Sequence, residues 1–220
     1  MSEAVFVELL SLSSGIVLLT AVLVLWRREL AMVIRVFAVQ GVALAGLVAV
    51  LAVRESSAEL GIVAAGVLIL RAGLLPYLLG RALTAAGPQR RETRPLVNVA
   101  ASLLAAAGLT LLALAVSAPL VALAPSPATA AIPVGMAVVL IGFFVLVTRR
   151  RALSQLIGFL LMDNGITTVG FLTTAGIGLV VELGVSLDIL LAVLVLGVLT
   201  GWMQTAFGNT DQPVGTILRH

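Results

Sequence analysis

The sequence lacks cysteine and lysine altogether, and its single histidine is His220. Without cysteine, the chain has no disulfides, no iron–sulfur ligands and no thiolate metal sites. One histidine likewise excludes a histidine-rich metal site or haem site. We therefore expect no metal, no bound cofactor and no catalytic centre on this chain.

Charge is also scarce, because charged residues make up only 10% of the chain and hydrophobic residues make up 61%. A soluble domain usually carries about a quarter charged residues. Apolar runs of about twenty residues, long enough to cross a bilayer, recur from one end to the other. These features predict an all-α, polytopic membrane helix bundle whose surroundings are lipid. Nucleic acid is not an expected partner, since no basic and aromatic surface is available to read bases.

Seven spans are expected, and each ends at charged, proline or glycine residues. A proline-rich turn over residues 119–133 should separate the fourth span from the fifth. The predicted spans cover residues 5–26, 33–53, 58–79, 96–116, 134–147 (with a possible start near Thr129), 153–172 and 183–206.

The loop arginines support this count. With seven spans and the N-terminus outside, only Arg54 lies in an outer segment, whereas six spans would place basic clusters on both sides. An excess of arginine in the inner segments is the usual pattern of membrane proteins, so an N-out, C-in topology in a bacterial inner membrane is expected. The inner segments would hold Arg27, Arg28, Arg81, Arg90, Arg91, Arg94, Arg149, Arg150, Arg151 and Arg219.

The chain divides most simply into a four-helix region (1–124), a three-helix unit (125–208) and a cytoplasmic tail (209–220). The long polar connection at 80–95 would equally allow a break after the third span. No internal repeat is visible at any fixed period, which argues against a transporter built from inverted repeats.

An aspartate, Asp163, lies near the middle of the sixth span, about twelve residues and roughly 18 Å beyond Arg151 along the helix. A carboxylate at that depth costs roughly 3 kcal/mol or more unless it is paired, hydrated or protonated. It is either a protonatable relay residue, which the depth favours, or a buried acid that fixes helix packing. Asn164 follows directly, and Thr167 lies one turn further along.

Other polar residues lie inside or at the edge of the predicted spans. Arg71, in the third span, cannot lose its proton, so it needs a carboxylate, water or carbonyl partner unless it extends to the interface. Pro76 should loosen its helix. In the seventh span, Asp188 is inside the hydrocarbon but off centre, and Glu182 is expected at the helix start. Gln40, in the second span, is expected to form hydrogen bonds between helices.

Two strings in the last third of the chain carry a family resemblance. The first is Leu-x-Asp-Asn-Gly, here ending at Asp163, Asn164 and Gly165. The second is Glu-Leu-Gly-x-x-x-Asp, which runs from Glu182 to Asp188. Together with the chain length and the sequence around Arg71, where the family usually has lysine, they resemble the hydrogenase-4 component E family. Its members are membrane subunits of group 4 nickel–iron hydrogenases and related complexes.

The last three helices of that family are similar to the K-type subunit of complex I and to the C subunit of multi-subunit Na⁺/H⁺ antiporters. In the K-type subunit a glutamate follows a glycine by two residues and precedes an asparagine by four. Here Gly158 and Asn164 match, but Leu160 occupies the glutamate position and the acid is Asp163. Residues three apart lie on the same helix face, so Asp163 would serve the same channel one turn deeper.

The resemblance implies a non-redox subunit of a hydrogenase-like assembly that supplies acids to a proton or Na⁺ path. Asp163 would exchange a proton, Asp188 would relay it outwards, and Arg71 would tune both acids. Nickel–iron and iron–sulfur groups, where present, would belong to partner subunits, and the expected partners are antiporter-like and membrane-anchor subunits. Two alternatives stay open, namely a purely structural scaffold of that assembly and a stand-alone transporter of small solutes.

Overall fold

The computed structural model describes residues 1–85 and 97–174, and all of its regular elements are helical. Because lipid offers no hydrogen bonds, a spanning chain must satisfy its backbone internally, as a helix does. The elements are α1 (Glu3–Trp26), α2 (Leu30–Glu55), α3 (Ala58–Val67), the π-helical segment η1 (Leu68–Leu74), α4 (Leu75–Ala85), α5 (Val99–Leu123), the 3₁₀ turn η2 (Thr129–Ala131), α6 (Ile132–Thr148) and α7 (Ala152–Thr174).

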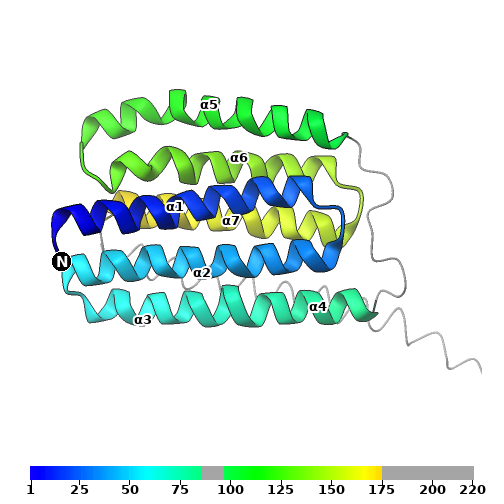
Figure 1. Cartoon of the computed structure of the whole chain (residues 1–220), viewed down its shortest axis with the longest axis horizontal. Helices are drawn as coiled ribbons and strands as arrows, with labels where there is room; N and C mark the ends of the chain where they lie inside the picture. Colours follow the sequence, from blue (N-terminus) through cyan, green and yellow to red (C-terminus); the bar gives the residue numbers. More distant parts are fainter. Residues whose placement is uncertain (86–96, 175–220) are drawn as a thin grey trace, which may run out of the picture.

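Six helices in the described ranges are long and apolar enough to cross a membrane, because α3, η1 and α4 run on as one span, Ala58–Thr84. The chain is therefore a multi-pass membrane protein. The spans lie side by side and run alternately in opposite directions (Figure 1). The α3–η1–α4 rod forms one edge of the bundle beside α2, and α5 forms the opposite edge beside α6.

Local contacts stabilise the end of α2 and the starts of α3 and α5. Ser56 ends α2 in the left-handed conformation, with φ at 53°, and the Ser57 side chain accepts a hydrogen bond from the Leu60 N–H, which caps α3. The Asn98 side chain caps α5 by accepting from the Ala101 N–H at 2.7 Å. Such caps satisfy N–H groups that the first turn of a helix leaves without partners.

Glycine allows α6 and α7 to pack backbone against backbone. Gly135 and Gly142 on α6, and Gly158 and Gly165 on α7, are each spaced by seven residues and face the other helix. A Cβ added to Gly142 would lie 2.7 Å from the Met162 Cα atom, closer than real side chains permit. Small residues at a helix interface permit this close approach in membranes. The tight pair fixes the rotation of α7 and so the direction of its polar residues.

The predicted spans one to six correspond to helices, but the predicted turn at 119–133 began too early. Pro119 lies inside α5, which continues to Leu123. A proline near a helix end removes one backbone hydrogen bond, and membrane helices tolerate this loss. The fifth span begins at Thr129 with a 3₁₀ turn, which is the earlier of the two starts that the sequence allowed. The seventh predicted span lies outside the described residues.

Candidate functional site

The arginine at the centre of the third span lies in the π-helical segment. Arg71 is the middle residue of the Ala58–Thr84 span and is 1% exposed. A π-helix widens the turn by one residue and is frequent at functional sites. Pro76 follows as the second residue of α4 and cannot donate a backbone hydrogen bond, so it favours an irregular turn before it.

Glycine on the neighbouring helix makes room for this wide turn. A Cβ on Gly41 of α2 would lie 2.7 Å from the Arg71 carbonyl carbon and 2.8 Å from the Ala72 nitrogen. Only glycine therefore lets the η1 backbone pack directly on α2. The close approach holds the Arg71 backbone inside the bundle, so that its side chain starts between α2 and α7.

Arg71 forms a buried ion pair with Asp163 of α7, with 2.7 Å between Arg71 Nη2 and Asp163 Oδ2. Asp163 is the middle residue of α7 and is 4% exposed. Arg71 also donates from Nη1 to the Asn164 side-chain oxygen, and from Nη2 to the Thr167 hydroxyl at 2.8 Å. An arginine and a carboxylate at mid-span thus compensate each other, as buried charges in membranes usually do.

A second layer of hydrogen bonds extends the cluster to α1 and α2. The Asn164 Nδ2 group donates to Gln40 Oε1 at 2.8 Å, and Gln40 Nε2 donates to the Val17 carbonyl at 3.0 Å. Gln40 is fully buried and Asn164 is 1% exposed. The chain of contacts therefore joins α1, α2, η1 and α7 at the centre of the bundle. We call Gln40, Arg71, Asp163, Asn164 and Thr167 the central polar cluster.

The cluster contains one carboxylate and one guanidinium, so it has a single negatively charged group. No group of three or more potential histidine, cysteine or carboxylate ligands occurs in the ranges 1–85 and 97–174. The arrangement suits charge compensation and proton exchange better than group-transfer chemistry. It offers a carboxylate that can take up a proton, a guanidinium that keeps its charge, and amide and hydroxyl groups that orient both.

Comparison with known proteins gives one informative match. No protein-family model matches the chain, and no solved structure matches it. A Mycobacterium tuberculosis protein, named uncharacterized protein Rv0085, is 48% identical over 211 residues, which is 96% of each chain. The chain belongs to the Rv0085 family. The match extends over nearly the whole of both chains, so the Rv0085 family shares this membrane region as a whole.

In this member of the Rv0085 family, the structure brings together five of the seven residues singled out from the sequence, and these five make up the central polar cluster. The other two, Asp188 and Glu182, lie outside the described residues. The roles assigned to all seven stay predictions. Thr168, which follows Thr167 on α7, donates its hydroxyl to the Asn164 carbonyl within its own helix.

Sequence reasoning missed two contributors to this site in the Rv0085 family member. One is Gly41, whose missing side chain admits η1, and the other is the Val17 carbonyl, which accepts from Gln40. The adjacent pair Gln40-Gly41 was an available signal, since a polar residue beside a small one marks a close helix contact in membranes. The Val17 carbonyl carries no signal in the sequence, because every residue has one.

Proposed function

We propose that the chain is a non-redox membrane subunit of a hydrogenase-like, complex I-related assembly, in which the central polar cluster forms part of a proton or Na⁺ path. The observation that carries the proposal is the buried Arg71–Asp163 pair, formed between the middle residues of two spans. Ionisable residues at that depth usually mark ion or proton routes. The hydrogenase-4 component E resemblance supplies the kind of assembly.

The pair suggests how the cluster would move a proton. Protonation of Asp163 removes the negative charge that Arg71 faces. The guanidinium would then be held mainly by its hydrogen bonds to Asn164 and Thr167. Arg71 keeps its own charge throughout. Arg71 lies in the π-helical segment η1, which departs from regular α-helix geometry, and such segments are frequent at functional sites. Loss of the proton towards Asp188 would restore the pair.

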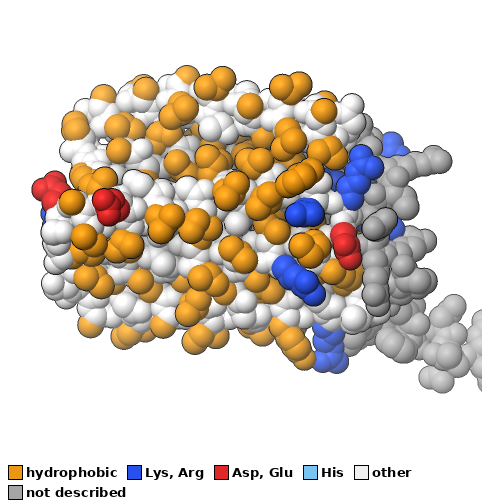
Figure 2. Space-filling view, in the orientation of Figure 1, with side chains coloured by type: hydrophobic (Ala, Val, Ile, Leu, Met, Phe, Trp, Pro, Cys, Tyr) orange, Lys and Arg blue, Asp and Glu red, His pale blue; other side chains and the backbone are white. Residues whose placement is uncertain are grey.

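Arginine placement supports the N-out, C-in topology with seven spans. Within the described ranges, arginines gather where α1 meets α2, near the end of α4, and where α6 meets α7, and these three places lie at one end of the bundle. Figure 2 shows most of the basic side chains toward that end, with an acidic side chain among them, and further acidic side chains at the other end. We call the end with most of the basic side chains the arginine end and place it in the cytoplasm of a bacterial cell.

In this proposal the last three spans form a unit similar to the complex I K-type subunit, and the first four attach it to its neighbours. The neighbours would be antiporter-like and membrane-anchor subunits. Nickel–iron and iron–sulfur groups would lie on other subunits, because this sequence has no cysteine. The tight packing of α6 on α7 supports treating them as one unit.

A structural role is the second candidate, and one observation favours it. Each member of the central polar cluster has a hydrogen-bond or ion-pair partner within the bundle. A fully satisfied polar network can serve to fix a unique packing without moving any ion. In that case the subunit would only connect larger subunits.

The test is Asp163→Asn in the intact complex of the native membrane, with Asp163→Glu to restore the acid. Glu59→Gln is the matched control, because it removes an exposed carboxylate at the start of α3. Assembly is measured by co-purification of the other subunits, and transport by proton uptake into inverted vesicles. We expect Asp163→Asn to assemble but to lose most of the proton uptake, and Asp163→Glu to recover part of it. If Asp163→Asn assembles normally and proton uptake is unchanged, the proton-path proposal is wrong and the structural role stands.

A further inference from the structure

The side-chain oxygen atoms of the central polar cluster are the atoms that a Na⁺ ion in the proposed path would need. A cation that leaves water is held by several oxygen atoms, which replace its water shell. Hard cations take these oxygens from carboxylate, amide and carbonyl groups. In the cluster such oxygens belong to Gln40, Asp163, Asn164 and Thr167. Whether Na⁺ can bind here therefore depends on what these oxygens already contact.

An N–H group already contacts an oxygen of each of these side chains. Arg71 Nη2 lies 2.7 Å from Asp163 Oδ2 and donates to the Thr167 hydroxyl at 2.8 Å. Arg71 Nη1 donates to the Asn164 side-chain oxygen, and Asn164 Nδ2 donates to Gln40 Oε1 at 2.8 Å. A Na⁺ ion that drew on these oxygens would have to displace the guanidinium from Asp163, Asn164 and Thr167 together.

Arg71 is held in this position. Its backbone packs on Gly41, where a Cβ would lie 2.7 Å from the Arg71 carbonyl carbon, and the residue is 1% exposed. The guanidinium keeps its charge, and two positive charges in contact repel strongly inside a bundle, where salt screens them little. A proton differs from Na⁺, because it bonds to one carboxylate oxygen, needs no shell of ligands and leaves the guanidinium where it is.

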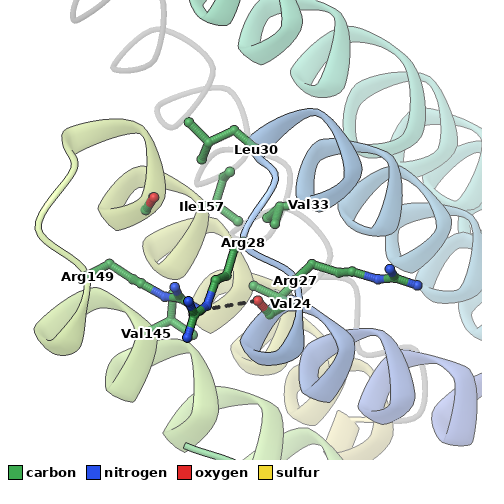
Figure 3. Close-up of a pocket in the computed structure, with 9 residues that line it drawn as sticks. Val24, Arg27, Arg28, Leu30, Val33, Val145, Arg149 and Ile157 are labelled. Carbon is green, nitrogen blue, oxygen red and sulfur yellow. Dashed lines mark hydrogen bonds between the residues drawn. The ribbon is translucent and has the colours of Figure 1, made fainter. Parts of the chain in front are cut away.

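A small space at the arginine end of the bundle also distinguishes the two ions. It lies between the α1–α2 and α6–α7 connections, and Figure 3 shows Arg28 and Arg149 extending into it. It holds about 10 Å³, which is room for one water molecule and not for Na⁺ with its water shell. A single water molecule can pass a proton on, whereas Na⁺ would have to shed its water before it entered.

We propose that Arg71 makes the path selective for protons over Na⁺, because its guanidinium occupies the place beside Asp163 that Na⁺ would need. The proposal rests on the proposed function, since it names the ion that this path carries and the residue that selects it. A purely structural arginine would not have this role, because its loss would loosen the bundle without creating a site for Na⁺.

The test measures Na⁺ binding by the full chain in nanodiscs, from the relaxation of the sodium NMR signal. We expect the wild type and Asp163→Asn to give the same signal, which means that Asp163 binds no Na⁺. Arg71→Gln replaces the guanidinium by a neutral amide, so it should gain Na⁺ binding, and adding Asp163→Asn should abolish the gain. Arg71→Lys keeps the positive charge and should gain none. Arg81→Gln, the matched control, removes an exposed arginine from α4 and should gain none either.

Transport separates this proposal from the proposed function. Proton uptake into inverted vesicles from the wild type should be the same in sodium chloride and in choline chloride. Uptake that requires Na⁺, or Na⁺ binding by the wild type that Asp163→Asn removes, would overturn the selectivity while the path itself stands.

Two further results would also count against the proposal. If Arg71→Gln keeps its helix content by circular dichroism and binds no Na⁺, Arg71 does not select the ion. If Arg71→Gln does not fold, the measurements on the wild type and on Asp163→Asn decide. Proton uptake that Asp163→Asn leaves unchanged would overturn the proposed function and the selectivity with it.

Discussion

Removing the charges of the central ion pair one at a time and then together tests its energetic role. The variants are Arg71→Met, Asp163→Asn and the double substitution. With Arg71 and Asp163 both less than 5% exposed, each single variant leaves one buried charge without its partner, and such losses cost about 3–5 kcal/mol. The cost should be larger for Asp163→Asn, because arginine cannot discharge itself whereas a carboxylate can take up a proton.

The double variant should cost less than the sum of the two single ones by about 2–3 kcal/mol, since it leaves no charge behind. The free energy of unfolding is measured in bicelles by denaturant titration, with helix content followed by circular dichroism. Glu59→Gln and Arg81→Gln, both at exposed side chains, should change it by no more than about 0.5 kcal/mol. Additive single costs, or single costs below about 1 kcal/mol, would refute the view that the two charges compensate each other.

Three further substitutions have expected outcomes in the same unfolding assay. Gly142→Ala should destabilise by about 1–3 kcal/mol, because its Cβ would lie 2.7 Å from the Met162 Cα atom, whereas Gly108→Ala, with open space around it, should be neutral or slightly stabilising. Gln40→Leu should cost about 1–3 kcal/mol, because the Asn164 amide would lose its acceptor; no loss would mean that the second layer contributes nothing. Ser117→Ala should be neutral or stabilising, because the Ser117 hydroxyl is buried without a partner in the described ranges, and a clear destabilisation would reveal a missing contact.

The sequence was sufficient to predict the six described spans, because lipid imposes a length and an apolar composition that can be read directly. It also placed Asp163 near mid-depth and Arg71 inside the third span, since depth follows from distance along a helix. The sequence indicated that Arg71 needs a partner, but it did not indicate which helix provides one. That choice depends on how helices rotate against each other.

Those rotations follow from contacts that composition does not reveal. The glycines of α6 and α7 turn Asp163 inwards, and Gly41 admits the π turn that carries Arg71. The π turn itself was not predicted, because one extra residue per turn leaves no signature in an apolar run. Pro119 was assigned to a turn because proline breaks helices in water, but a helix in lipid has no alternative hydrogen-bond partners and continues past it.

The distance along the chain between the central partners has a consequence for biosynthesis. Arg71 and Asn164 are 93 residues apart, so at about 5–20 residues per second the ribosome needs roughly 5–20 s to make the second after the first. During that time the Ala58–Thr84 span carries an arginine whose acceptors do not yet exist, and the apolar residues of that span must drive its insertion into the membrane. Insertion machinery that retains the early spans until α7 emerges would therefore keep Arg71 out of lipid. Release of the third span before that time would expose an arginine without its acceptors to lipid.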